Sequence, residues 1–457
     1  MTVASRPLPG PPRPYSFPTF KRSTLDGGAR LLVAEMAKLP IVSVTVVIAA
    51  GAESDPAGKE GLAQLTARAM VEGTSSSSAL ALAGRIEKLG GVIDSDAGWD
   101  SARINLTCLS KHLEESLDVL GEILTSASFP QHELDRLRDE RLAEIEQIRS
   151  EPRGLAEEAF TEFVYAADAR YALPPGGTRE SVSVLSREDV VQLHADLYSP
   201  GNADLVIAGD VSLADAARMI DRAMSGWTGA TRKRADMSAA PAPAGPRALL
   251  VEKEGAAQSE LRIGHVGIPR SHPDYFPFSI MNAALGGVFS SRINLNLREK
   301  HGYTYGAHSI IDWRKAPGPF LVSTAVQTEV TAEAARETIG ELQRIREAEI
   351  AADELSLVTS YLQGVFPIRY ESTAAIAGAL ANLVTYDLPD DYYDTYRDRV
   401  AAVTTADVLR AAQDHIKPDS LRMVVVGDAS LRESLGGIGL GPVDVRGSEP
   451  AAEPSNV

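Results

Sequence analysis

The sequence predicts an α+β protein of two homologous domains, each a mainly antiparallel β-sheet packed with α-helices. At 457 residues the chain is longer than one hydrophobic core comfortably serves, and it suits two domains of about 200 residues. Strand-like runs and helical segments interleave, and several strand-like runs are close enough in the chain to pair as hairpins. A segment in the first half also recurs in the second half, which indicates a duplicated unit.

The repeat aligns residues 186–213, SREDVVQLHADLYSPGNADLVIAGDVSL, with residues 404–431, TTADVLRAAQDHIKPDSLRMVVVGDASL, at a constant offset of 218. The shared residues are Asp189, Pro200, Gly209, Asp210, Ser212 and Leu213, which recur as Asp407, Pro418, Gly427, Asp428, Ser430 and Leu431. Both copies read as a capped helix, a turn and a buried strand. We therefore expect the same helix–turn–strand unit to be built twice.

Composition narrows the class of protein. Hydrophobic residues make up 44% and charged residues 23% of the chain, as in ordinary globular proteins. The net charge of −17 argues against nucleic acid or an anionic membrane as a partner and suits cationic peptides, although solubility alone also explains it. The single Cys108 can form neither an internal disulfide nor a cysteine zinc site.

The first half should begin with two strands over 29–37 and 41–52, paired as an antiparallel hairpin. A second pair of strands is expected over 92–109, and a buried strand over 203–208. The expected helices cover 62–71, 79–89, 113–126, 132–151, 155–165 and 187–197, and one more ends near 224. The helix over 132–151 is highly charged, with acids and bases spaced to pair on an exposed face.

Segments rich in proline and glycine mark the boundaries of the domains. The predicted organisation is a disordered arm over 1–18, a first domain over 19–228, a linker over 229–247, a second domain over 248–436 and a disordered tail over 437–457. The arm has prolines but no apolar core of a signal peptide, and the longest apolar run, residues 39–52, is too short to cross a bilayer. The expected location is therefore the cytoplasm, without a membrane partner.

The most informative stretch is residues 286–306, GGVFSSRINLNLREKHGYTYG. Ser290 or Ser291 is placed to cap a helix that ends at Gly302, after which Tyr303 to Tyr305 should resume as a strand. Arg298 and Tyr305 lie seven residues apart, so both side chains can meet and donate hydrogen bonds to a carbonyl or an oxyanion. Spacing alone favours the simpler interpretation, a surface arginine and a half-buried strand tyrosine.

Gly-Gly-x-x-Ser-Ser-Arg followed by Leu-Arg-Glu-Lys-x-Gly-x-x-Tyr resembles the second-domain signature of the pitrilysin/insulinase peptidases, the inverted zincins. The resemblance extends over roughly residues 20–435. It implies two related domains that form half of a clamshell chamber, and it implies that Arg298 and Tyr305 grip the backbone of a peptide substrate opposite a zinc ion.

The same resemblance places the family's zinc motif, His-x-x-Glu-His, at positions that here hold Gln64, Ala67 and Arg68. The motif needs two imidazoles on one helix face to hold zinc and a glutamate to activate its water. An amide, a methyl group and a cation supply none of these groups. Glu144 occupies the position of the third ligand, where it reads either as one carboxylate of a charged helix or as a partner for Arg68.

A lost metal motif beside an intact Arg/Tyr pair resembles the non-catalytic subunits of heterodimeric members of this family. The expected function is a substrate-binding subunit that has no intrinsic cofactor or activity and supplies Arg298 and Tyr305 to the zinc site of a catalytic partner that cleaves unfolded peptides. The alternative is a catalytically inert scaffold of the same fold. An independent hydrolase is disfavoured, since the chain has no GxSxG, P-loop or dinucleotide-binding motif.

Overall fold

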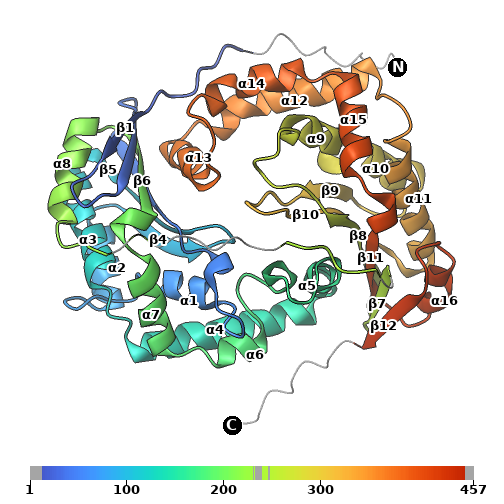
Figure 1. The fold of residues 1–457 in the computed structure, drawn as a ribbon, viewed down its shortest axis with the longest axis horizontal. Helices are drawn as coiled ribbons and strands as arrows, with labels where there is room; N and C mark the ends of the chain where they lie inside the picture. The colour runs from blue at the N-terminus through green and yellow to red at the C-terminus, as the bar shows by residue number, and fades with distance from the viewer. Residues whose placement is uncertain (1–12, 230, 232–238, 245–246, 448–457) are drawn as a thin grey trace, which may run out of the picture.

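The computed structural model describes residues 13–229, 231, 239–244 and 247–447. They form two α+β halves, each built on a six-stranded mixed sheet, as the sequence predicts (Figure 1). None of the helices in these ranges is long and apolar enough to span a bilayer.

The first sheet has the strand order β1-β2-β6-β3-β5-β4. Its strands are β1 (Lys21–Thr24), β2 (Arg30–Glu35), β3 (Ile41–Ile48), β4 (Val92–Ala97), β5 (Ala102–Leu109) and β6 (Ala203–Gly209). The helices of this half are α1 (Leu62–Ala69), α2 (Ala79–Lys88), α3 (Leu113–Ser126), α4 (Gln131–Ser150), α5 (Pro152–Val164), α6 (Arg179–Ser183), α7 (Arg187–Leu197) and α8 (Leu213–Ala223).

The second sheet has the order β12-β7-β11-β8-β10-β9. Its strands are β7 (Ala248–Glu252), β8 (Gln258–Val266), β9 (Ala307–Ile311), β10 (Pro319–Gln327), β11 (Arg422–Gly427) and β12 (Val443–Gly447). The helices are α9 (Tyr275–Asn282), α10 (Arg292–Asn294), α11 (Thr331–Arg344), α12 (Ala352–Arg369), α13 (Thr373–Thr385), α14 (Tyr392–Ala402), α15 (Thr405–His415) and α16 (Leu431–Gly436).

The repeated segment builds the same part of both sheets. Helices α7 and α15 each begin with a capping box, made by Ser186 with Asp189 and by Thr404 with Asp407. Strand β6 pairs in parallel with β2 and antiparallel with β3, and β11 pairs in the same two ways with β7 and β8. All residues of β6 and β11 are buried, which explains why their apolar runs do not alternate.

The predicted hairpin of residues 29–52 is wrong. Strands β2 and β3 do not pair, because β6 returns from later in the chain and lies between them. A strand buried on both faces needs partners on both edges, and β2 and β3 supply them. The pair predicted over 92–109 is confirmed as β4 and β5.

Each sheet is covered on one face by a helix from the other half. Helix α13 packs on β3 and β6 of the first sheet, with Ile376 and Leu380 buried against Val206. Helix α5 packs on β8 and β11 of the second sheet, with Phe160 buried against Val424. Figure 1 shows both helices on the inner side of the opposite half. Each half thus has a hydrophobic core of its own, and two further buried clusters are shared between the halves.

Disorder was predicted for residues 1–18 and 437–457, and this prediction is wrong for the residues of both segments that the structure describes. In the arm, Tyr15 Oη donates a hydrogen bond to the Tyr370 carbonyl at 2.9 Å, and the Phe17 ring stacks on Tyr393 with centroids 4.6 Å apart. In the tail, β12 adds to the edge of the second sheet, because β7 offers it a free parallel edge. Residues 1–12, 448–457 and most of the predicted linker (230, 232–238 and 245–246) lie outside the described residues.

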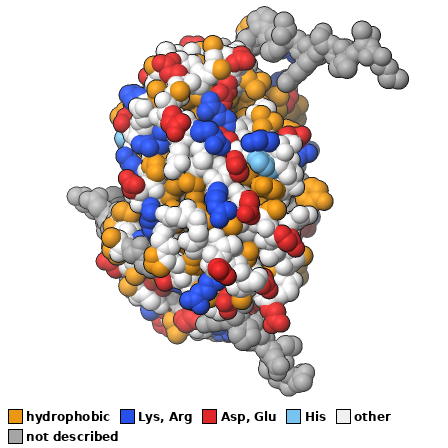
Figure 2. Space-filling view, turned by 90° about the vertical axis from the view of Figure 1, so that its right-hand side faces the viewer, with side chains coloured by type: hydrophobic (Ala, Val, Ile, Leu, Met, Phe, Trp, Pro, Cys, Tyr) orange, Lys and Arg blue, Asp and Glu red, His pale blue; other side chains and the backbone are white. Residues whose placement is uncertain are grey.

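The negative net charge is not gathered into one field on the face seen in Figure 2, where acidic and basic side chains are intermixed. Such a surface favours solubility over the binding of a polyanion.

Candidate functional site

The positions of the altered zinc motif lie together where α1 packs on α4. Arg68 Nη1 donates to Glu144 Oε1 at 3.0 Å, and Arg141 Nη1 donates to Glu144 Oε2 at 3.0 Å. Partial burial opposes ionisation of Glu144, but the hydrogen bonds from Arg141 and Arg68 outweigh it and hold its pKa below the usual range. Glu144 is thus an ionised carboxylate bridged by two guanidinium groups.

A buried carboxylate holds the start of α1 in place. Asp55 accepts hydrogen bonds from the backbone N–H of Gly61 at 2.8 Å and of Ala63 at 2.7 Å, and from Arg170 Nη2 at 2.9 Å. Gly61 has a φ of +97°, which a residue with a side chain rarely adopts. These contacts fix where α1 begins and so set the positions of Gln64, Ala67 and Arg68 on it.

The residues present do not fit a zinc ion. The cavity beside Gln64 and Arg68 has a volume of only about 10 Å³, and Leu65, Leu137 and Arg141 help to close it. Gln64 offers one amide oxygen, which makes no hydrogen bond to any described residue, Ala67 offers no donor, and Arg68 adds a positive charge. Zinc sites need three or four nitrogen, sulfur or carboxylate donors, and of the four motif positions Glu144 alone supplies one. A second carboxylate, Asp96, lies 3.9 Å from Arg68 Nε and pairs with the same guanidinium.

The segment that carries Arg298 is held by two stretches of π-helix. These are η5 (Ala283–Gly287) and η6 (Leu295–Lys300), which flank α10. A Cβ on Gly286 would lie 2.6 Å from the backbone nitrogen of Ser309, so η5 can approach β9 this closely only with glycine. π-Helical turns are rare in proteins, and where they occur they are often at functional sites.

Arg298 lies against an exposed aromatic ring. Its Cζ is 4.7 Å from the centroid of Phe289, a side chain that is 71% exposed. Arg298 Nη1 is 3.5 Å from Glu299 Oε1 and makes no hydrogen bond to any described residue. The guanidinium is therefore oriented by the ring and keeps a donor unused.

Tyr305 is 93% exposed, and nothing in the described part of the chain holds its hydroxyl. Its loop is shaped by Gly302, whose φ is +68°, and by Asn294, whose Oδ1 accepts the Ala307 N–H at 3.1 Å. Arg298 and Tyr305 make no hydrogen bond or ion pair with each other. The structure thus presents them as two separate groups on one surface segment.

Two local predictions for this segment are wrong. Tyr303 to Tyr305 form a loop, and the strand begins at Ala307, because Gly302 and the hydrogen bonds of Thr304 to Gly306 turn the chain first. Ser291 stands at the N-cap of α10, but its side chain makes no capping hydrogen bond. Phe289 was not singled out from the sequence. The available signal was that this aromatic residue stands among glycine and serine residues in a loop.

The altered motif and the Arg298 segment lie on opposite sides of the molecule. Figure 1 shows α1 and α4 at the lower left and α10 at the upper right. The two sets of residues therefore belong to different halves of the molecule.

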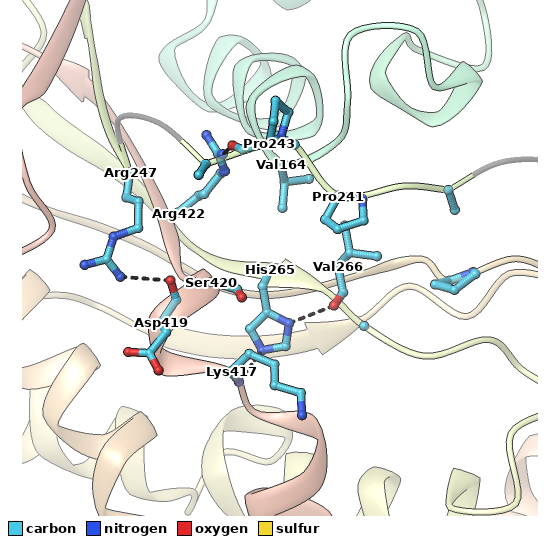
Figure 3. Close-up of a pocket in the computed structure, with 15 residues that line it drawn as sticks. Val164, Pro241, Pro243, Arg247, His265, Val266, Lys417, Asp419, Ser420 and Arg422 are labelled. Carbon is cyan, nitrogen blue, oxygen red and sulfur yellow. Dashed lines mark hydrogen bonds between the residues drawn. The ribbon is translucent and has the colours of Figure 1, made fainter.

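A large pocket in the described part of the chain belongs to neither set. It has a volume of about 720 Å³ and lies where residues 239–244 cross the end of β8 (Figure 3). His265 fills its floor, with Nδ1 against the Val266 carbonyl at 2.9 Å and Nε2 accepting the Lys417 N–H at 3.2 Å. Figure 3 shows Arg247 and Arg422 directed to backbone carbonyls on different sides, so the pocket has no converging set of groups.

Comparison with known proteins identifies the family. The sequence pattern described as insulinase (peptidase family M16) matches residues 30–173, and the pattern described as peptidase M16 inactive domain matches residues 185–361. The chain belongs to the M16 (insulinase) peptidase family. The two matches together cover most of both M16 halves.

Its relatives are named as zinc proteases. A curated protein of Streptomyces coelicolor, named an uncharacterized zinc protease, is 23% identical over 402 residues, which cover 87% of each chain. A crystal structure titled peptidase M16 inactive domain from Pseudomonas fluorescens is 26% identical, with a TM-score of 0.83 over 90% of this chain and 98% of that one. A chain in a structure of complex III2 from Candida albicans shares the fold, with a TM-score of 0.75, 14% identity and coverage of 89% of this chain and 95% of that one.

Proposed function

We propose that this M16 chain is the non-catalytic, substrate-binding subunit of a two-chain zinc peptidase, and that it supplies Arg298 and Tyr305 to a partner's His-x-x-Glu-His site. The observation that carries the proposal is the contrast between its two sites. The metal positions are closed by the Arg68–Glu144–Arg141 network, whereas Arg298 keeps an unused donor and Tyr305 is exposed.

The arrangement in space supports action on a second chain. The Arg298 segment lies across the molecule from α1 (Figure 1), and the chain's own motif positions offer no pair of imidazoles to hold zinc for a peptide bound there. Exposed Phe289 and Tyr305 leave the segment open toward whatever faces it. A partner chain that bears zinc is the remaining source of the hydrolytic centre.

The partner's zinc would supply the activated water. This chain would bind and orient the peptide. Arg298 is placed to donate to a peptide carbonyl, and such charge-assisted hydrogen bonds contribute roughly 1.5–3 kcal/mol. Tyr305 would donate its hydroxyl proton in a hydrogen bond to the oxyanion that develops as water attacks, the kind of contact that accelerates the step most.

The competing proposal is an inert scaffold. It is favoured by the fold shared with the complex III2 chain and by the helices that each half exchanges onto the other sheet. A scaffold has no use for an arginine with an unused buried donor beside an exposed ring. The two proposals therefore differ in whether Arg298 and Tyr305 affect catalysis.

Co-expression tests the proposed subunit role. The chain alone should cleave no unfolded peptide, and an M16 chain of the same genome that carries His-x-x-Glu-His should co-purify with it and cleave faster in the complex than alone. A complex that forms without any gain in peptidase activity would favour the scaffold. Activity of this chain alone, retained after gel filtration and abolished by Glu144→Gln, would overturn the proposal.

A further inference from the structure

A cluster of two histidines and one aspartate, separate from the residues discussed above, lies where the start of α9 meets the end of α15. His272 and Asp274 precede α9, and His415 is the last residue of α15. His415 Nε2 is 2.7 Å from Asp274 Oδ2, and the rings of His272 and His415 have centroids 4.9 Å apart. One donor atom of each residue lies within 4.8 Å of the other two, and all three residues are partly buried.

The donor set suits a divalent transition-metal ion. Two imidazoles and a carboxylate are a common zinc ligand set, and bonds near 2.0–2.1 Å place tetrahedral ligand atoms about 3.3 Å apart. His415 Nε2 and Asp274 Oδ2 are 2.7 Å apart, and all three donor atoms lie within 4.8 Å of one another, so small side-chain movements would bring them to that spacing. The backbone N–H of Asp274 donates to His272 Nδ1 at 3.1 Å, which fixes this ring beside the carboxylate.

The charged groups around the cluster allow a metal cation to replace the Arg410 guanidinium at Asp274. Arg410 now donates to both oxygens of Asp274 at 2.9 Å, and it is the group that an incoming ion must displace. Two further carboxylates flank this guanidinium, Asp407 at 3.8 Å and Asp414 at 3.6 Å, so Arg410 has partners to move to. The negative end of the α15 dipole also lies at His415 and favours positive charge there.

We propose that His272, Asp274 and His415 form a binding site for Zn²⁺ or a similar ion, such as Co²⁺ or Ni²⁺, which ties the start of α9 to the end of α15. Imidazole selects these ions over Mg²⁺ and Ca²⁺, which prefer all-oxygen sites. The site is independent of the altered motif on α1 and of the Arg298 segment. Its proposed role is structural, since it joins the N-terminal end of α9 to the C-terminal end of α15.

Titration of the metal-free full-length chain with Co²⁺ tests the site, because tetrahedral Co²⁺ absorbs visibly and Zn²⁺ can then displace it. We expect one ion per chain and a higher melting temperature with the ion bound. His272→Ala should weaken binding by at least about tenfold, since one of three ligands is lost. Arg410→Gln should tighten binding, because it removes the competing cation.

Two controls separate this site from others. His132→Ala removes an exposed histidine elsewhere, and Glu144→Gln removes the carboxylate of the altered motif; neither should change Co²⁺ binding. Equal binding by wild type and His272→Ala, or no binding by wild type and Arg410→Gln at a hundred-micromolar ion, would overturn the proposal. Loss of binding in Glu144→Gln with no loss in His272→Ala would place the ion on α4 instead.

Discussion

Arg68 is the residue that most directly explains why the motif region is closed. Its guanidinium pairs with Glu144, the residue at which the family resemblance places the third zinc ligand. The pair lies at a partly exposed site, where one ion pair adds about 0–1 kcal/mol to stability. The main effect of this ion pair is therefore that it engages the Glu144 carboxylate, because its contribution to the stability of the fold is small. The sequence left two interpretations of Glu144 open, and the hydrogen bond to Arg68 decides for the second.

Restoring the motif should restore a metal site. We expect the triple variant Gln64→His, Ala67→Glu, Arg68→His to bind one additional zinc per chain, because Glu144 is then released to act as the third ligand. The measurement is metal analysis in the His272→Ala background, so that the cluster at α15 does not contribute. Adding Glu144→Gln should abolish the gain, whereas a folded triple variant that binds no zinc would show that the rest of the site has also been lost.

Buried histidines should make the fold sensitive to acid. Burial lowers the pKa of His194 and of His265 to about 4, from 6.5 in an unfolded chain. Between these values the unfolded state binds more protons, so stability falls as the pH drops from about 6.5 to 4, by up to about 3 kcal/mol for each ring. His194 packs against Phe129 and Tyr198 with centroids 5.1 Å from each.

The check is urea unfolding of wild type and His194→Phe across this pH range. Phenylalanine keeps the ring packing and cannot titrate, so the variant should lose less stability than wild type on acidification. A variant with the same pH profile as wild type would mean that His194 does not titrate differently on unfolding.

At the scale of elements, the sequence predicted most helices of the first half to within a few residues, because their caps and periodicity are local; it gave no prediction for α11 to α14. Ser186 and Thr404, for example, cap the helices that they were expected to cap. The errors concern pairing: β6 separates β2 from β3, and β12 joins an edge that lies almost 200 residues earlier in the chain. Such partners are chosen by tertiary packing, which a local pattern does not encode.

The same limit applies to the candidate site. The sequence could supply the residue types Arg298 and Tyr305, but the π-helical turns and the ring of Phe289 that orient Arg298 depend on how η5 packs on β9. The spacing of residues in the sequence reveals neither the exposure of Phe289 and Tyr305 nor the separation of α1 from α10.

Helices α5 and α13, which each pack on the sheet of the other half, are where substitutions should destabilise the fold most. Phe160→Ala on α5 should destabilise the chain by about 3–5 kcal/mol, since the ring is 2% exposed and fills the core of the opposite half's sheet. Val184→Ala, at a side chain that is 61% exposed, should change stability by no more than about 0.5 kcal/mol. Chemical denaturation measures both, and similar small losses would mean that α5 does not contribute to the core.

For the whole molecule, the two buried clusters that contain residues of both halves imply that the halves unfold together. Helix α13 covers the first sheet and α5 covers the second, so neither half retains both covered faces when the other unfolds. Calorimetry should show one transition, and a fragment of residues 13–229 alone should expose the apolar face of β3 and β6 and bind a hydrophobic dye. Two separate transitions, with a folded isolated fragment, would contradict this cooperativity.

The measurement that tests the proposed function most directly is the peptidase activity of the two-chain complex with variants of this chain. Arg298→Ala should raise KM, and Tyr305→Phe should lower kcat by about 10²–10³, as the loss of an oxyanion donor does. Lys300→Ala and Tyr303→Phe are matched controls in the same segment and should behave as wild type, with the complex intact in every case. Unchanged kinetics for both Arg298→Ala and Tyr305→Phe in an intact, active complex would contradict a role for this chain in binding the substrate.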